Sequence, residues 1–185
     1  MRKFDVRKIL NIFLVAAMAS VIAGLYGVIN DQITFSISSE YYTKYRFLQY
    51  NLVQVEGDSR IIYPRILVVL VTFLSTWWFP LISGLIIIIF NLIQNTWKML
   101  LKTSVLAMLI SILITVFSAI IGFILGSLII SKLPKYYFAD WCFIPDKLND
   151  YENYITAGTM DAFNFFGGIL GLIVAIFYSY KKRNV

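Results

Sequence analysis

The chain contains no histidine and only one cysteine among its 185 residues. The first absence excludes zinc sites that depend on imidazole, as well as Ser-His-Asp and Cys-His catalytic sets, and the second excludes an intrachain disulfide and a CxxC redox pair. Charged residues are also scarce, at 14% of the chain, whereas soluble proteins carry roughly a quarter. The remainder is 59% hydrophobic with a mean hydropathy of +0.78. This composition predicts an integral membrane protein and gives no reason to expect a cofactor, a metal or a nucleic-acid partner.

Four apolar segments are free of charged residues and reach the length of about 20 residues that crossing a bilayer requires. The predicted spans are residues 9–29, 66–93, 105–130 and 162–180. Backbone amides in lipid must bond within their own segment, so each span is expected to be a helix. The sequence therefore predicts an all-α, four-transmembrane-helix bundle that forms a single integral membrane domain, residues 1–185. The predicted connections are an outer loop at 30–65, an inner loop at 94–104, a second outer loop at 131–161 and a basic tail at 181–185.

The charges are divided unequally between the two sides of these spans. The N-terminus, the inner loop and the tail hold nine basic residues and one acidic residue, a net charge of +8, while the two long loops hold seven basic and nine acidic residues, a net charge of −2. Because Lys and Arg near span ends favour the cytoplasm, we expect both termini on the cytoplasmic side of the membrane. An alternative is that the first span is a secretory signal cleaved near Ala17–Ala19, but its apolar run is longer than such signals usually are.

Small residues recur at helical spacing in three of the spans, where they let helix backbones approach closely. The predicted packing residues are Ser20, Gly24 and Gly27 in the first span, Ser118, Gly122 and Gly126 in the third, and Gly167 and Gly171 in the fourth. Such stripes are packing signals and carry no information about function.

The second span contains Trp77 and Trp78 followed by Pro80 near its centre. A proline there removes a backbone donor and predicts a kink. Tryptophan prefers the membrane interface, so two of them near the midplane indicate a contact with protein or with a lipid-derived ligand. Ordinary bulky packing around the kink is the simpler interpretation.

The first outer loop begins with an alternation of apolar and hydroxyl side chains in which Ile33, Phe35 and Ile37 share one face. A period of two predicts a short extended segment. Beyond it, Tyr41, Tyr45 and Leu48 have the i, i+4, i+7 spacing of an amphipathic helix lying in the membrane interface, with Ser38 or Ser39 as its N-cap.

The second outer loop is aromatic and leads into a predicted helix that starts near Asp146 and continues into the fourth span. If so, Asp161 and Asn164 lie near the outer membrane boundary, where polar groups need partners. Asp31, at the top of the first span, is a candidate neighbour of Asp161 through water or a basic residue. The single cysteine, Cys142, is expected to be a small buried hydrophobe, or else to form an intermolecular disulfide.

Two short segments resemble a signature of small, uncharacterised bacterial four-helix membrane proteins. In that signature Y-G-x-x-[HN]-D-Q-[IV]-T is followed by E-Y-[FY]-T, and the matching residues here are Tyr26, Gly27, Asn30, Asp31, Gln32, Ile33, Thr34, Glu40, Tyr41, Tyr42 and Thr43. Asn30 stands where the family usually has histidine, so no imidazole chemistry carries over. The resemblance implies an architecture and a bacterial setting but no activity.

Three functions fit these observations. The first is a non-enzymatic scaffold or accessory subunit, embedded in the bilayer, whose aromatic outer loops bind a membrane-protein partner or a second copy. The second is a membrane-interface enzyme on a lipid-like substrate that uses Asp31 or Glu40 as acid or base, with Asp140 nearby. The simpler role for Asp31 and Thr34 is to satisfy backbone groups where a helix ends. The third is an oligomeric channel or carrier, which the charge-free spans disfavour.

The expected orientation can be tested on the single cysteine. Once denaturation has exposed Cys142, a membrane-impermeant thiol reagent added to intact cells should label it, because the loop that contains it is predicted to lie outside. Labelling that appears only after the cytoplasmic membrane is opened would contradict this topology.

Overall fold

The structure is a computed structural model that describes residues 6–53, 62–92, 94–138 and 143–182. All regular elements in these ranges are helical. In chain order they are α1 (Val6–Ile37), α2 (Ser39–Tyr41), the π-helical turn η1 (Tyr42–Arg46), α3 (Phe47–Gln49), α4 (Pro64–Thr76), α5 (Trp78–Asn91), α6 (Trp97–Leu128), the 3-10 turns η2 (Ile130–Lys132) and η3 (Lys135–Tyr137), and α7 (Tyr151–Lys181). Asp140 and Cys142 lie outside the described residues.

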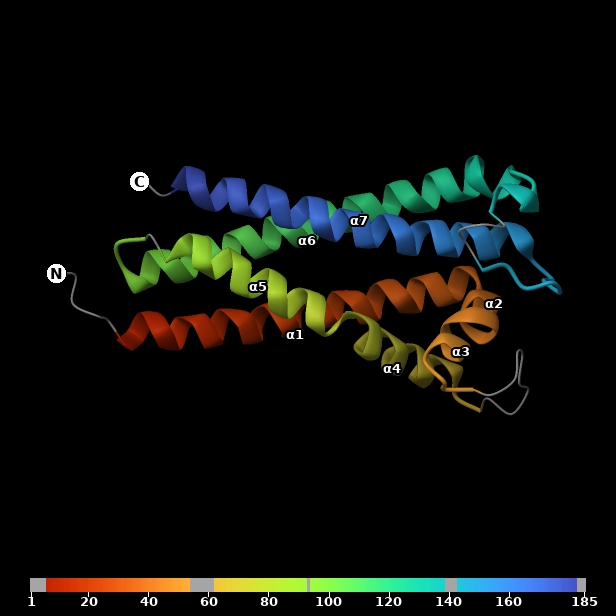
Figure 1. Cartoon of the computed structure of the whole chain (residues 1–185), viewed down its shortest axis with the longest axis horizontal. Helices are drawn as coiled ribbons and strands as arrows, with labels where there is room; N and C mark the ends of the chain where they lie inside the picture. Colours follow the sequence, from red (N-terminus) through yellow and green to blue (C-terminus); the bar gives the residue numbers. More distant parts are fainter. Residues whose placement is uncertain (1–5, 54–61, 93, 139–142, 183–185) are drawn as a thin grey trace.

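The long helices run side by side, and the start of α1 lies at the same end of the molecule as the end of α7 (Figure 1). Within the described ranges, α1, α6 and α7 are each long and apolar enough to cross a membrane. The pair α4 and α5 passes the same test as one span bent by 43°. The chain therefore has the three or four apolar helices of a multi-pass membrane protein.

Helices α6 and α7 pack closely against each other at small residues that the sequence analysis predicted. A Cβ added to Gly167 would lie 2.4 Å from Cβ of Ser118, one added to Gly171 would lie 2.5 Å from the carbonyl oxygen of Ser111, and one added to Gly122 would lie 2.5 Å from Cβ of Phe163. These distances leave no space for a side chain. Gly126 is close to the backbone of Thr156 in the same way.

Helix α1 packs against α4 and α5 through fewer small residues than expected. Gly27 lies against Thr72 of α4, and Ala19 lies against Gly84 of α5. Gly24 is different, because nothing in the described part of the chain lies within 4 Å of the position of its missing Cβ. Ser20 bonds only within its own helix, where its hydroxyl donates to the carbonyl oxygen of Ala16 at 3.1 Å. The predicted packing stripe of α1 is therefore wrong at Gly24 within this single chain.

The second span is broken at Trp77, where α4 ends and α5 begins. Pro80 lacks the N–H that would bond to the carbonyl of Thr76, and its ring crowds that carbonyl, so the break falls where the proline predicts it. The indole N–H of Trp78 donates to the carbonyl oxygen of Ser75 at 3.1 Å. The hydroxyl of Thr76 bonds back to the carbonyl oxygen of Thr72 at 2.6 Å.

The extended segment predicted for Ile33–Ile37 is wrong, because α1 continues as a helix through Ile37. The buried side of this last stretch repeats every three to four residues: Gly27, Asn30, Asp31, Thr34, Phe35 and Ser38. Thr34 donates to the carbonyl oxygen of Asn30 at 2.9 Å, as a hydroxyl does inside a helix. The expectation that Asp31 and Thr34 mark a helix end is wrong for the same reason.

The helical segment after Ser38 is present, and the Ser38 hydroxyl accepts from the N–H of Tyr41 at 3.2 Å as its N-cap. Its buried face differs from the predicted one of Tyr41, Tyr45 and Leu48. The π-helical turn η1 adds a residue to one turn, and this places Tyr41, Tyr42, Arg46 and Phe47 inside. The segment packs against α1, α4 and α7, so it forms part of the protein core.

Helix α7 begins at Tyr151, later than the predicted start near Asp146. The side chain of Asp150 accepts from the N–H of Asn153 at 3.0 Å and caps the helix. Pro145 lies in the connection that precedes this helix.

The contact between α6 and α7 gives a direct test of the packing. Gly171→Ala should lower the free energy of unfolding by about 1–3 kcal/mol, because the new methyl group meets the backbone of Ser111. Gly24→Ala is the matched control and should be neutral or slightly stabilising, because the methyl group meets open space and alanine favours a helix. Thermal unfolding in detergent, followed by circular dichroism, measures both. Equal losses for the two variants would contradict this packing.

Candidate functional site

A cavity of about 460 Å³ lies between α1, the bent pair α4 and α5, α6 and α7, next to the turn η1. Its volume is in the range of sites that hold small molecules. Most of the wall is apolar, and it includes Ile22, Ala23, Trp78, Phe79 and Phe165. The cavity is therefore a pocket among the helices with an apolar interior.

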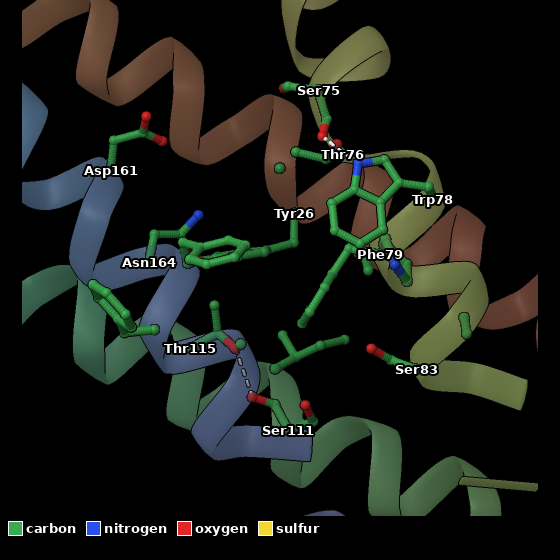
Figure 2. Close-up of a pocket in the computed structure, with 18 of the residues that line it drawn as sticks. Tyr26, Ser75, Thr76, Trp78, Phe79, Ser83, Ser111, Thr115, Asp161 and Asn164 are labelled. Atoms are coloured by element: carbon green, nitrogen blue, oxygen red, sulfur yellow. Dashed lines mark hydrogen bonds between the residues drawn. The ribbon is translucent and has the colours of Figure 1, made fainter. Parts of the chain in front are cut away.

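The polar residues of the wall gather mainly at one end of the cavity. Figure 2 shows Asp161 and Ser75 there, whereas Ser83 and Ser111 lie toward the opposite end. Asn164 lies on α7 below Asp161, and its side-chain carbonyl oxygen accepts from the hydroxyl of Tyr26 at 2.6 Å. The cavity thus has one polar end and a long apolar remainder.

Arg46 is the basic residue of the polar end, and it is only 9% exposed. Its NH1 lies 3.8 Å from Oδ2 of Asp161, and its NH2 donates to the hydroxyl of Ser75 at 3.3 Å. Nε is buried and has no hydrogen-bond partner among the residues that the structure describes. A buried guanidinium with a missing acceptor is costly, so this atom marks an incomplete site.

Asp31 lies behind the cavity wall and is only 3% exposed. Its Oδ2 lies 2.7 Å from the hydroxyl of Thr72, and its Oδ1 accepts a long 3.5 Å bond from Asn30. The charged groups that act on it are Asp161 and Arg46. The structure therefore brings Asp31 and Asp161 into one group with a basic residue, Arg46, that the sequence analysis did not identify.

Two tyrosines complete what we call the Arg46 cluster, defined as Arg46, Asp31, Asp161, Tyr41 and Tyr42. Tyr41 donates to Oδ2 of Asp161 at 2.9 Å. Tyr42 is 1% exposed and makes edge-on ring contacts with Tyr41 and with Phe35. Both tyrosines come from η1 and the residue before it, so the π-helical turn positions three of the five members.

The electrostatics of this cluster keep Arg46 charged and its tyrosines neutral. Burial disfavours the guanidinium cation, but the negative charges of Asp161 and Asp31 outweigh it and raise the pKa of Arg46. Burial, and then the charge of Asp161, raise the pKa of Tyr41 well above its ordinary value. Tyr41 therefore keeps its proton and acts as a hydrogen-bond donor.

Glu40 lies apart from the cavity and holds two loops together. Its carboxylate accepts from the N–H of Asn149 at 3.0 Å and from the N–H of Asp150 at 2.9 Å, and it pairs with Lys44. Burial favours the protonated form, but the Lys44 hydrogen bond and then the two backbone hydrogen bonds outweigh it and lower the pKa of Glu40. This arrangement is structural, and it leaves Glu40 no role beside Asp31.

The other residues of the family-like segment have local roles. Gln32 exchanges hydrogen bonds with Arg65, whose guanidinium also lies over the ring of Phe35 at 5.2 Å. Thr43 donates to the carbonyl oxygen of Ser39 at 3.0 Å. The hydrogen bonds between Gln32 and Arg65 join α1 to α4, and the hydrogen bond of Thr43 stabilises the turn after α2.

The tryptophan pair is divided between two environments. Trp78 lines the cavity, together with Pro80 and Phe79, whereas Trp77 is 53% exposed and is not part of the wall.

The sequence analysis did not assign Arg46, Tyr26 and Ser75 to a site. The sequence signal for Arg46 was a basic residue within a tyrosine-rich segment. Asp31 and Asp161, on other helices, were two acidic residues for which no basic partner had been named.

Metal binding has no support in the described part of the chain, where no group of three or more His, Cys, Asp or Glu residues could hold an ion. Hydrogen bonding, charge pairing and apolar contact are the interactions that this site offers. They suit the binding and orientation of an amphiphilic molecule.

The structural role of Glu40 can be tested by Glu40→Gln. The substitution should lower the free energy of unfolding by about 1–3 kcal/mol at neutral pH, because three charge-assisted hydrogen bonds weaken. Since the pKa of Glu40 is lowered in the folded protein from its ordinary value of 4.5, the advantage of the wild type is complete above that pH and disappears as the pH falls through the lowered value. Urea or thermal unfolding across pH measures this difference.

Glu152→Gln is the matched control, because the pair of Glu152 with Lys132 is exposed to solvent and should contribute little. Two results would contradict the structural role of Glu40. One is that Glu40→Gln is as stable as the wild type at neutral pH, and the other is that the difference in their free energies of unfolding widens as the pH falls.

Comparisons of the chain with family models, with curated proteins and with solved structures gave no match. The resemblance to small bacterial membrane proteins therefore stays a prediction, and the function has to be argued from the site itself.

Proposed function

We propose that the protein is a non-enzymatic membrane component that binds one amphiphilic, lipid-like molecule in the cavity between α1, α5, α6 and α7. The observation that carries this proposal is the division of the cavity wall. Arg46, Asp161 and Asn164 gather at one end, and Trp78, Phe79 and Ile22 line the apolar part. A molecule with a polar head and an apolar tail matches both parts of this wall.

The depth of the polar end supports the same proposal. Twenty residues of α7 separate Asp161 from the basic residue Lys181, which is about 30 Å along a helix and about the thickness of a hydrocarbon core. The polar end thus lies near the level of the lipid head groups on the side opposite Lys181. A lipid-like molecule can place its head there and its tail among the helices without leaving the bilayer.

The arrangement of the acidic residues counts against an enzyme that uses Asp31 and Glu40. Glu40 is engaged by two backbone N–H groups and by Lys44, and Asp31 is buried behind the wall. A general acid or base must reach the proton that it transfers, through direct contact or one water. Asp161 does reach the cavity, but its close partners are a guanidinium and a phenol that both stay protonated.

We further propose that the protein lies in a bacterial cytoplasmic membrane with both termini inside, and that its outer end binds a membrane-protein partner or a second copy. Tyr136 and Tyr137 stack at 4.6 Å and are 69% and 55% exposed. Exposed aromatic rings are frequent in protein interfaces, and these two support an accessory role.

Filling the cavity tests the main proposal. Ala23 lines the cavity, so Ala23→Phe should reduce the amphiphile that copurifies with the protein by about tenfold or more, because the ring occupies the space of the tail. Native mass spectrometry in detergent measures the bound molecules per chain. Ala17→Phe is the control on the exposed face of the same helix and should bind as the wild type does.

The proposal is wrong if the wild type carries no bound amphiphile after addition of lipid. It is equally wrong if Ala23→Phe and Ala17→Phe retain the same amount.

A further inference from the structure

The Arg46 cluster contains two carboxyl groups and one guanidinium group. Asp31 and Asp161 both act on Arg46, and Arg46 and Asp161 are in turn the charged groups that act on Asp31. The pair of Glu40 and Lys44 is neutral in itself. With both carboxyl groups ionised, the cluster carries a net charge of −1 in a poorly hydrated place, and a cation would stabilise it.

Asp161 is the carboxylate that a ligand can reach. It lines the cavity, and its side chain is 25% exposed. Its Oδ2 accepts from Tyr41 and faces Arg46, and the described part of the chain provides no donor to Oδ1. A positively charged donor in the cavity could therefore bind Asp161 without displacing a protein group.

Two donors at the same end lack an acceptor. Nε of Arg46, on a side chain that is 11% exposed, has no partner in the described part of the chain. The carbonyl oxygen of Asn164 is taken by Tyr26, and Figure 2 shows the amide nitrogen directed into the cavity. Nε itself is enclosed, but the Arg46 guanidinium and Asn164 both line the cavity and favour an acceptor on the ligand close to the positive group.

We propose that the bound amphiphile carries a primary ammonium group next to a hydrogen-bond acceptor, with the ammonium at Asp161 and the acceptor at Arg46 and Asn164. This inference rests on the proposed function, and it specifies the head group. Two kinds of molecule have this chemistry. In an ethanolamine phospholipid the acceptor is a phosphate oxygen, and in a long-chain amino alcohol it is a hydroxyl group.

The wild-type protein allows a test that needs no variant. Purified protein in detergent is mixed with a dioleoyl ethanolamine phospholipid or with its N-acetyl derivative, and bound molecules are counted by native mass spectrometry. The N-acetyl form keeps the tail and the phosphate but loses the positive charge, and it should bind at least about tenfold more weakly. A long-chain amino alcohol and its N-acetyl derivative form the second pair. The pair with the larger difference in binding between the amine and its N-acetyl form identifies which of the two kinds of molecule the site takes.

Asp161→Asn provides the matched variant, with Asp146→Asn as the control, because Asp146 lies on the surface of the connection before α7. Asp161→Asn should bind the amine lipid about as weakly as the N-acetyl lipid, whereas Asp146→Asn should keep the wild-type preference. If Asp161→Asn does not fold, the wild-type comparison still decides the question.

The outcomes separate the two proposals. Binding that Ala23→Phe abolishes, but that is equal for amine and N-acetyl lipids, overturns the head-group inference and leaves the cavity proposal standing. Absence of any lipid binding that depends on the cavity overturns both.

Discussion

The burial of Arg46 against Asp161 and Asp31 is the interaction on which the rest of the structure depends. A guanidinium cation cannot be buried beside lipid without negative partners, and its partners come from two helices far apart in sequence, α1 and α7. The cluster therefore fixes how the segment after α1 folds back onto the bundle. Thr72 and Ser75 of α4 join the same cluster through hydrogen bonds to Asp31 and Arg46. One buried charge thus ties together three long elements and a π-helical turn.

The same constraint gives the cavity its two-part wall. The break before Pro80 bends α5 relative to α4 by 43°, and α6 and α7 are held close by glycine contacts. The space between these pairs is closed at one end by the Arg46 cluster. In the proposed placement, its apolar part lies within the depth of the bilayer, and its polar part lies near the head groups. The binding site that we propose is thus formed by a chain without histidine and with few charges.

Much of this architecture was predictable from the sequence, because membrane spans are set by long apolar runs and close helix contacts by small residues. The close packing at Gly167 and Gly171 and the break near Pro80 follow from local chemistry, whereas the pairing of these glycines with α6 came from the structure. The helix through Ile37 did not follow, because the alternation of Ile33, Phe35 and Ile37 hid a buried polar face. The members of that face bond within α1 and to Thr72 of α4 and Met160 of α7. The inward position of Arg46 depends on the extra residue of η1, for which an isolated sequence has no clear signal. The nearness of Asp31 to Asp161 was a reasonable expectation, but the identity of the basic residue between them required the tertiary structure.

The most direct test of the account is an experimental density map of the protein extracted together with its native lipids. The account predicts a single elongated density in the cavity, with its head beside Asp161, Arg46 and Asn164 and its tail running past Trp78 toward Ser111. Arg46 should be buried between Asp161 and Asp31 in the same map. An empty cavity in which the helices have closed together, or an Arg46 side chain turned outward to solvent, would contradict the account.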